Sequence, residues 1–220
     1  DVETITRSGD DDPGAETAEP DLLVEIPHGA TAFSHYRKLR EVLSPDLPDD
    51  LRDFFFVNTD VGSTEWGRQV ARWVAEPDAS VLELVSEEIR GRITGLPPRR
   101  ILVVRCLIPR TFIDTNRIVD AESSGGMTAA IADYIRAPGD RERLLAMHAR
   151  YHELVAEAYD RVCGPGGLAL MPHTYAPKSI QIESFDEGIG KALRAAYEPG
   201  TYAGWPLRPE VDLINEAPDG

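Results

Sequence analysis

The chain has 220 residues, of which 42% are hydrophobic, and this is enough for one globular domain with a sizeable core. Its 38 acidic residues exceed its 23 lysines and arginines, and the resulting formal charge of -15 would repel a phosphate backbone, which argues against a nucleic-acid partner. No apolar stretch reaches the ~18 residues that a membrane span needs, two cysteines do not make a disulfide framework, and no signal peptide is visible, so we expect a cytoplasmic protein without a membrane partner.

In the first half of the chain, expected strands alternate with expected helices. Residues 1–20 are rich in Asp, Glu, Gly, Thr and Pro, a composition typical of a disordered acidic tail. The elements expected after this tail are a strand over 21–27, a helix over 34–43, a short aromatic strand over 54–57, a helix over 64–74 with Ser63 or Thr64 as its N-cap, and a mixed stretch over 77–98.

The second half begins with the strongest strand pattern, an apolar run over 101–108 that is continuous enough for burial on both faces and contains Cys106 as a small buried residue. The elements expected after it are a helix over 128–136, a long amphipathic helix over 140–162, a strand over 168–171, a helix over 186–197 and a strand over 210–214. This alternation predicts a single α/β domain over 21–220. The turn-like residues that end the chain suggest that the domain is truncated at its C-terminus.

Two histidines, His28 and His173, each follow a proline at the end of an apolar run. Each run predicts a buried strand that stops at Pro-His, so both imidazoles are expected at the carboxyl ends of strands, the sheet edge where ligands bind in open α/β folds. Histidines that are distant in sequence can converge as metal ligands. A solvated histidine at a proline-capped strand end explains a single Pro-His equally well.

Asp60 follows the aromatic run over 54–57 and is the expected third ligand. Two imidazoles and one carboxylate, with a fourth position left to water, are a common ligand set of catalytic zinc, which lowers the pKa of the water towards ~7. An aspartate alone is more often an N-cap or a turn residue, and its place after the aromatic run is what favours the metal.

A second polar cluster, Arg110, Asn116 and Arg117, follows the strand expected over 101–108. A guanidinium group binds a carboxylate with two hydrogen bonds, and an amide adds a directional one, so the cluster suits a small-molecule substrate with a free carboxylate. The alternative, slightly favoured by residue type alone, is a surface ion pair of Arg117 with Asp114 or Asp120.

A rival metal pair is His148 and His152, whose i, i+4 spacing places both rings on one face of the helix expected over 140–162. No glutamate follows His148, so the metalloprotease pattern His-Glu-x-x-His is absent. The many charges of this helix favour a solvated face over a metal site.

These segments, in order, resemble the N-formylglutamate amidohydrolase family, which is distantly similar to zinc carboxypeptidases and aspartoacylases. The resemblance covers about residues 22–175, and its most specific part is 110–117, similar to the family's Arg...Asp-x-Asn-Arg signature. Residues 27–29 resemble the family's Pro-His-Ser-Gly without the serine, 58–62 resemble its early aspartate motif, and His173-Thr174 stands where the family has His-Ser.

The resemblance implies a mixed, largely parallel sheet flanked by helices in a carboxypeptidase-like architecture. It implies a zinc ion held by His28, Asp60 and His173, with the Arg110, Asn116 and Arg117 cluster on the substrate carboxylate. It also implies a catalytic glutamate on a late strand, acting as general base. Glu183 is the only similar residue after His173 and comes earlier than expected, so we expect the base beyond Gly220.

The expected function is therefore zinc-dependent hydrolysis of the acyl amide of a small, N-formylglutamate-like N-acyl amino acid by a metal-activated water. One alternative is a metallo-carboxypeptidase or deacylase that acts on larger peptidic substrates. The other is a non-catalytic carboxylate-binding module that has lost the metal.

Overall fold

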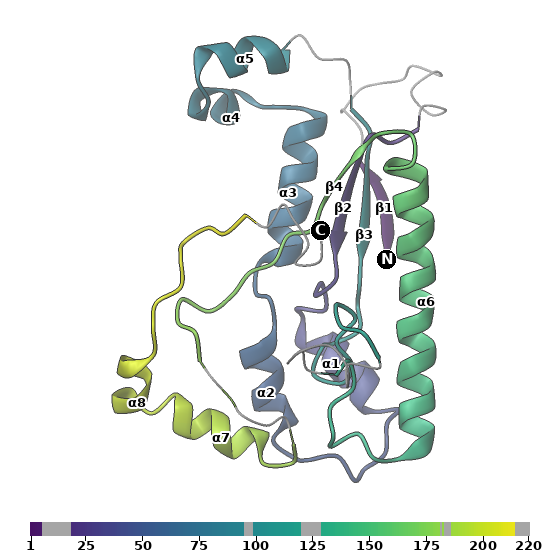
Figure 1. Ribbon diagram of the computed structural model, residues 1–220, viewed down its shortest axis with the longest axis vertical. Helices are drawn as coiled ribbons and strands as arrows, with labels where there is room; N and C mark the ends of the chain where they lie inside the picture. The colour runs from purple at the N-terminus through teal and green to yellow at the C-terminus, as the bar shows by residue number, and fades with distance from the viewer. Residues whose placement is uncertain (6–18, 95–98, 120–128, 181, 183–185, 214–220) are drawn as a thin grey trace.

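The computed structural model in Figure 1 describes residues 1–5, 19–94, 99–119, 129–180, 182 and 186–213. Four strands form an open sheet in the order β1-β3-β2-β4. They are β1 (Val2–Ile5), β2 (Leu22–Ile26), β3 (Ile101–Arg105) and β4 (Leu168–Leu170). β2 is parallel to both β3 and β4, and β1 runs antiparallel along the outer edge of β3. The predicted α/β class with a mixed, largely parallel sheet is confirmed.

Helices flank both faces of this sheet. They are α1 (Phe33–Arg40), α2 (Leu51–Asn58), α3 (Ser63–Ala75), α4 (Ala79–Leu84), α5 (Glu87–Thr94), α6 (Pro138–Val162), α7 (Ile189–Ala196) and α8 (Pro199–Gly204). α3 covers one face and the long α6 covers the other, while α1, α2 and α7 surround a second core below the sheet (Figure 1). None of the described helices is both long and apolar enough to cross a bilayer.

β2 is buried on both faces, which explains its nearly continuous apolar sequence. Val24 and Ile26 pack towards α3, and Leu23 packs on the opposite face towards α6. All three side chains are fully buried, and burial of each contributes about 1.5–3 kcal/mol to folding. The strand therefore holds the residues that follow it, including His28, in a fixed position.

The expected strand over 54–57 is wrong, because these residues belong to α2. The side chains of Leu51, Phe54 and Phe55 are buried, whereas Phe56 is 56% exposed. Burial at i, i+3 and i+4 is the pattern of one helix face, and a strand would have alternated instead. The four consecutive apolar residues 54–57 are compatible with a helix and with a strand. The burial of Leu51, one helical turn before Phe54 and Phe55, is what distinguishes the helix.

The two neighbouring phenylalanines of α2 offer a matched test of this placement. Phe55 is 1% exposed and contacts the ring of Tyr36, with 5.3 Å between the ring centroids. We expect Phe55→Ala to lower the free energy of unfolding by about 3–5 kcal/mol, because it leaves a cavity in the core. Phe56→Ala should lower it by only about 0.5–1.5 kcal/mol, because Phe56 is largely exposed and loses chiefly its ring contact with Phe33, at 5.5 Å between centroids. Urea unfolding measures both, and equal losses for the two variants would contradict the burial of Phe55 and the exposure of Phe56.

The helices expected over 34–43, 64–74, 140–162 and 186–197 are confirmed as α1, α3, α6 and α7, and the mixed stretch contains α4 and α5. The helix expected over 128–136 is wrong for the described residues 129–136, which are irregular. Here Ile131 bridges to Ile113, and the N–H of Asp114 donates to the carbonyl of Ala130 at 2.8 Å, so the segment pairs with the chain beyond β3 rather than with itself.

Two differences concern the ends of the chain. Val2–Ile5, expected within the disordered tail, form β1, because their β-branched residues pair with the free edge of β3; residues 6–18 of that tail lie outside the described part. The strand expected over 210–214 is wrong for 210–213, where Leu213 is 85% exposed and the structure assigns no strand; residue 214 is not described.

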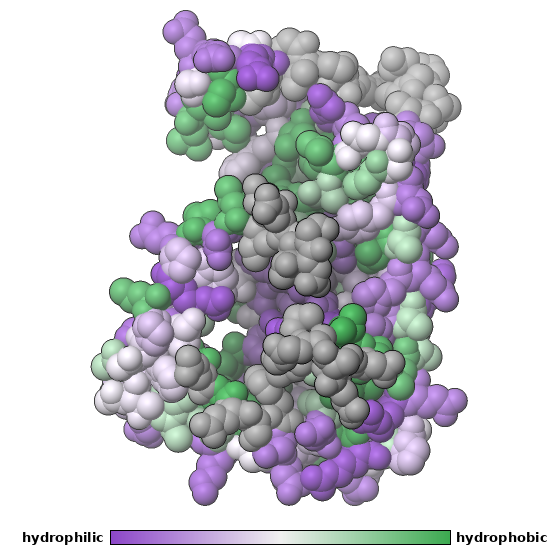
Figure 2. Space-filling view, viewed as in Figure 1, coloured by the Kyte–Doolittle hydropathy of each residue, from purple (hydrophilic) through white to green (hydrophobic). Residues whose placement is uncertain are grey.

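The strand expected over 168–171 is present as β4, but it is not buried. It is an edge strand with Leu168 72% exposed. Hydrophobic side chains are exposed elsewhere too: Figure 2 shows them over α4 and α5, the elements to which Leu84 (83% exposed) and Ile89 (45% exposed) belong.

Candidate metal centre

The three predicted metal ligands meet at the carboxyl edge of the parallel strands. His28 follows β2, His173 follows its neighbour β4, and Asp60 lies in the turn between α2 and α3. His28 and Asp60 are 6% and 4% exposed, while the side chain of His173 is 32% exposed. The site is therefore closed on the side of the core and open on the side of β4.

Both histidines turn Nδ1 towards one oxygen of Asp60. His173 Nδ1 lies 3.0 Å and His28 Nδ1 lies 3.3 Å from Asp60 Oδ2, and one ligand atom from each residue lies within 4.8 Å of the others. Ligands on a tetrahedral zinc ion at about 2.0–2.1 Å are separated by about 3.3 Å. The donor types and their spacing thus fit a zinc ion with a fourth position left for water.

The start of α3 fixes the backbone beside His28. Ser63 Oγ donates to the carbonyl of His28 at 3.4 Å, and Thr64 Oγ1 donates to that of Gly29 at 3.2 Å. The prediction of Ser63 or Thr64 as the N-cap of α3 is wrong: the N-cap is Gly62, whose φ of 84° lies in the left-handed region. At Gly29 a Cβ would lie 2.9 Å from the carbonyl oxygen of Cys106, so the close approach of the β2 and β3 ends requires glycine there.

Asp114 is a second carboxylate at the site, and it was not among the predicted site residues. Its Oδ1 lies 2.8 Å from His28 Nε2. A histidine ligand commonly donates its second ring N–H to a carboxylate, which fixes the tautomer and raises the basicity of the ligating nitrogen. Asp114 therefore leaves Nδ1 of His28 free to face Asp60. The signal was present in the sequence, because Asp114 is the aspartate of the Asp-x-Asn-Arg segment.

The guanidinium group of Arg110 joins the two carboxylates. Its two terminal nitrogens lie 3.3 Å from Asp60 Oδ1 and 2.9 Å from Asp114 Oδ2. Arg117 approaches the same oxygen of Asp114 through Nε at 3.7 Å, so the ion pair considered as the alternative for Arg117 is present. Asn116 contacts Asp114 through its backbone N–H at 3.0 Å. All three predicted carboxylate-binding residues thus surround Asp114; Asp120 and Glu183 lie outside the described residues.

The charged groups of this cluster lower the pKa values of its two aspartates and raise the pKa of His28. Burial alone would raise the pKa of Asp60, but hydrogen bonds to His173 and His28 outweigh it and hold this pKa well below 3.8. Asp114 is lowered in the same way, through His28 and the charge of Arg110. Burial alone would lower the pKa of His28, yet its hydrogen bonds to Asp114 and Asp60 raise it above 6.5. In the metal-free protein, the two buried carboxylates favour the protonated form of His28, and Arg110 contributes a second positive charge beside them.

These shifts predict how the stability of metal-free protein depends on pH. The lowered aspartate pKa values stabilise the fold above pH 3.8, and this contribution is lost as the pH falls towards the folded-state values. The raised pKa of His28 stabilises it below pH 6.5, and that contribution is lost as the pH rises through the folded-state value. Urea unfolding with a chelator present should therefore show maximal stability between these limits. The decrease in the free energy of unfolding at high pH should be smaller in His28→Gln than in the wild-type protein. A decrease of equal size in that variant would contradict the attribution of this effect to His28.

His148 and His152 lie on α6, and among the described residues neither forms a hydrogen bond with the three predicted metal ligands, whereas His148 contacts the main chain of Arg117. His148 is 6% exposed, so the expected solvated face is wrong at this position. Its Nε2 lies 3.0 Å from the carbonyl oxygen of Arg117 and 3.2 Å from Nε2 of His152. Cys106 is buried and has a free thiol, as predicted.

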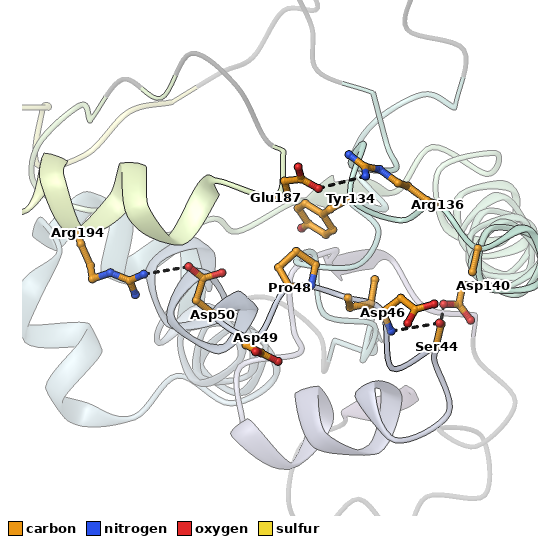
Figure 3. A pocket seen from close by; sticks show the side chains of 12 residues that line it. Ser44, Asp46, Pro48, Asp49, Asp50, Tyr134, Arg136, Asp140, Glu187 and Arg194 are labelled. Carbon is orange, nitrogen blue, oxygen red and sulfur yellow. Dashed lines mark hydrogen bonds and ion pairs between the residues drawn. The ribbon is translucent and has the colours of Figure 1, made fainter.

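A cavity of about 800 Å³ lies apart from the metal centre, between the α1–α2 connection, the start of α6 and α7 (Figure 3). Two of its arginines already pair with acidic neighbours: Arg136 lies 3.1 Å from Glu187, and Arg194 lies 3.0 Å from Asp50. The residues drawn in Figure 3 include none of the three predicted metal ligands.

Comparisons of the chain with protein-family models, with curated proteins and with solved structures gave no match. The interpretation of the site therefore rests on its residues and their geometry.

Proposed function

We propose that this protein holds a zinc ion through Nδ1 of His28, the carboxylate of Asp60 and Nδ1 of His173, and hydrolyses the acyl amide of a small N-acyl amino acid. The observation that carries the proposal is the convergence of these three side chains at the carboxyl edge of the sheet, with two imidazole nitrogens 3.0 and 3.3 Å from one aspartate oxygen. A zinc ion in this set would polarise the acyl carbonyl and lower the pKa of a water molecule.

Other residues of the chain hold the proposed ligands in position and place charged groups around this centre. Asp114 holds the ring of His28, and the backbone of His28 is held by Ser63. Arg110 and Arg117 bring two guanidinium groups to the same place, with side chains 28% and 33% exposed. Their charges already pair with Asp60 and Asp114, so it is the added charge of a zinc ion that would make the centre positive, in a protein of formal charge -15, and would favour an anionic substrate there. The arginines would bind the free carboxylate of an N-acyl amino acid, with N-formylglutamate as the first candidate.

The sheet order and the position of the centre are compatible with the carboxypeptidase-like architecture that the sequence resemblance implies. We extend the proposal to that architecture.

The experiment uses tag-free protein, stripped with a chelator, reloaded with zinc and incubated with N-formyl-L-glutamate. We expect zinc-dependent release of formate and glutamate, and slower or no hydrolysis of N-formylated peptides. His35→Ala is the matched control, because His35 lies on α1 outside the cluster and its loss should change nothing. Hydrolysis of peptides but not of N-acyl amino acids would favour the peptidase alternative. Carboxylate binding without zinc or turnover would overturn the proposal in favour of a binding module.

A further inference from the structure

The helix α6 carries two histidines on the face that meets the segment following β3. His148 and His152 are one helical turn apart, so their rings lie on the same side of α6. His148 is buried, whereas His152 is exposed to solvent. His148 is therefore held within the protein, while an ion from solvent can reach His152.

The rings of the two histidines bring their Nε2 atoms within hydrogen-bond distance of one another. The two Nε2 atoms are 3.2 Å apart, while the ring centroids are 4.3 Å apart and the planes are tilted by 40°. Two ligands on one tetrahedral zinc ion are separated by about 3.3 Å. The nitrogens therefore already have the separation that a shared metal ion requires.

A main-chain oxygen lies within hydrogen-bond distance of the His148 nitrogen. The carbonyl oxygen of Arg117 is 3.0 Å from His148 Nε2. In the metal-free protein, one N–H on His148 Nε2 faces two acceptors, this oxygen and Nε2 of His152. A metal ion that replaces this single proton would be bound by all three atoms at once.

We propose that His148 Nε2, His152 Nε2 and the main-chain oxygen of Arg117 form a second site for a divalent transition-metal ion, separate from the centre at His28. Imidazole ligands select Zn²⁺, Ni²⁺ or Cu²⁺ over Mg²⁺ or Ca²⁺, and the exposure of His152 leaves a position for water. This inference does not depend on the proposed function, because the two sites share no ligand.

An ion in this site would tie the segment after β3 to α6. The side chain of Arg117 lies 3.7 Å from Asp114, and Asp114 lies 2.8 Å from Nε2 of His28. The bound ion would therefore brace the segment 114–117, which holds His28 and carries one of the arginines. Hydrogen exchange at the amides of this segment should slow when the second ion binds.

The test is calorimetric titration of tag-free, chelator-stripped protein with Zn²⁺, with Mg²⁺ as the comparison ion. We expect two Zn²⁺ per wild-type chain, one in His152→Ala, one in His173→Ala and none in the double variant. His35→Ala is the matched control and should bind two. Because His152 is exposed, its replacement leaves the core intact. In His173→Ala, Zn²⁺ should shift the imidazole NMR signals of His148 and His152 but not those of His35.

The outcomes separate this site from the first. One ion that persists in His152→Ala and disappears in His173→Ala would overturn the second site and support the first. One ion that persists in His173→Ala and disappears in His152→Ala would support the second site and contradict the proposed function. Binding of Mg²⁺ that depends on His152 would contradict the assigned metal class.

Discussion

His173→Ala is expected to abolish zinc binding at the first centre and to reduce hydrolysis of N-formyl-L-glutamate by at least about 10³-fold. The substitution removes one of three protein ligands, and loss of about 4 kcal/mol of electrostatic stabilisation corresponds to that factor. The side chain of His173 is 32% exposed and follows an exposed edge strand, so its truncation should not disturb the core. His173 is therefore the cleanest of the three ligands to remove.

The measurement is zinc content by mass spectrometry together with kcat/KM, both in the His152→Ala background, so that only ions at the first centre are counted. Thermal unfolding of stripped protein confirms that the variant is folded. His35→Ala in the same background is the control and should retain zinc and activity. A His173→Ala protein that keeps one zinc ion or its full kcat/KM would show that His173 is not a ligand.

The sequence was informative where a residue type and its position allow one physical interpretation. The Pro-His ends of two apolar runs placed His28 and His173 at one sheet edge, because parallel strands bring their carboxyl ends together. The apolar run over 101–108 contains β3, since burial on both faces requires a continuous hydrophobic sequence, but the strand ends at Arg105 and residues 106–108 lie beyond it. Asp60 was predicted to follow a strand. It follows a helix instead, and it reaches the site because the turn before α3 carries it there.

Contacts between segments that are distant in the sequence explain most of the predictions that the structure contradicts. Whether residues 129–136 form a helix depends on their contact with Ile113, which no local pattern contains. Val2–Ile5 become ordered only because the edge of β3 is free to pair. The position of His148 has the same cause: a histidine in a charged helix is normally solvated, but this one meets the carbonyl of Arg117 from a segment 31 residues away. Contacts of this kind become visible only when the chain is folded.

Asp114→Asn should weaken zinc binding at the first centre by about 10–100-fold, although Asp114 is not one of the proposed ligands. The amide keeps the size of the carboxylate but loses its charge. In the wild-type protein, this charge lies 2.8 Å from His28 Nε2 and makes Nδ1 of the same ring a stronger metal ligand. The same loss should lower the pKa of His28, because this hydrogen bond is the largest of the interactions that raise it. NMR titration of metal-free protein measures that pKa, and competition with a chelator in the His152→Ala background measures the zinc affinity of the first centre alone.

The matched control is Asp140→Asn, since Asp140 is also a buried carboxylate that accepts a hydrogen bond, from the backbone N–H of Ser44 at 2.8 Å. Both variants should lose stability, because each weakens a buried hydrogen bond to a charged group. Only Asp114→Asn should change the pKa of His28 and the affinity for zinc. If both variants left these two quantities unchanged, Asp114 would merely pair with Arg110. If both variants weakened zinc equally, the effect would reflect general loss of stability. A selective effect of Asp114→Asn would identify Asp114 as the residue that positions His28 for the metal.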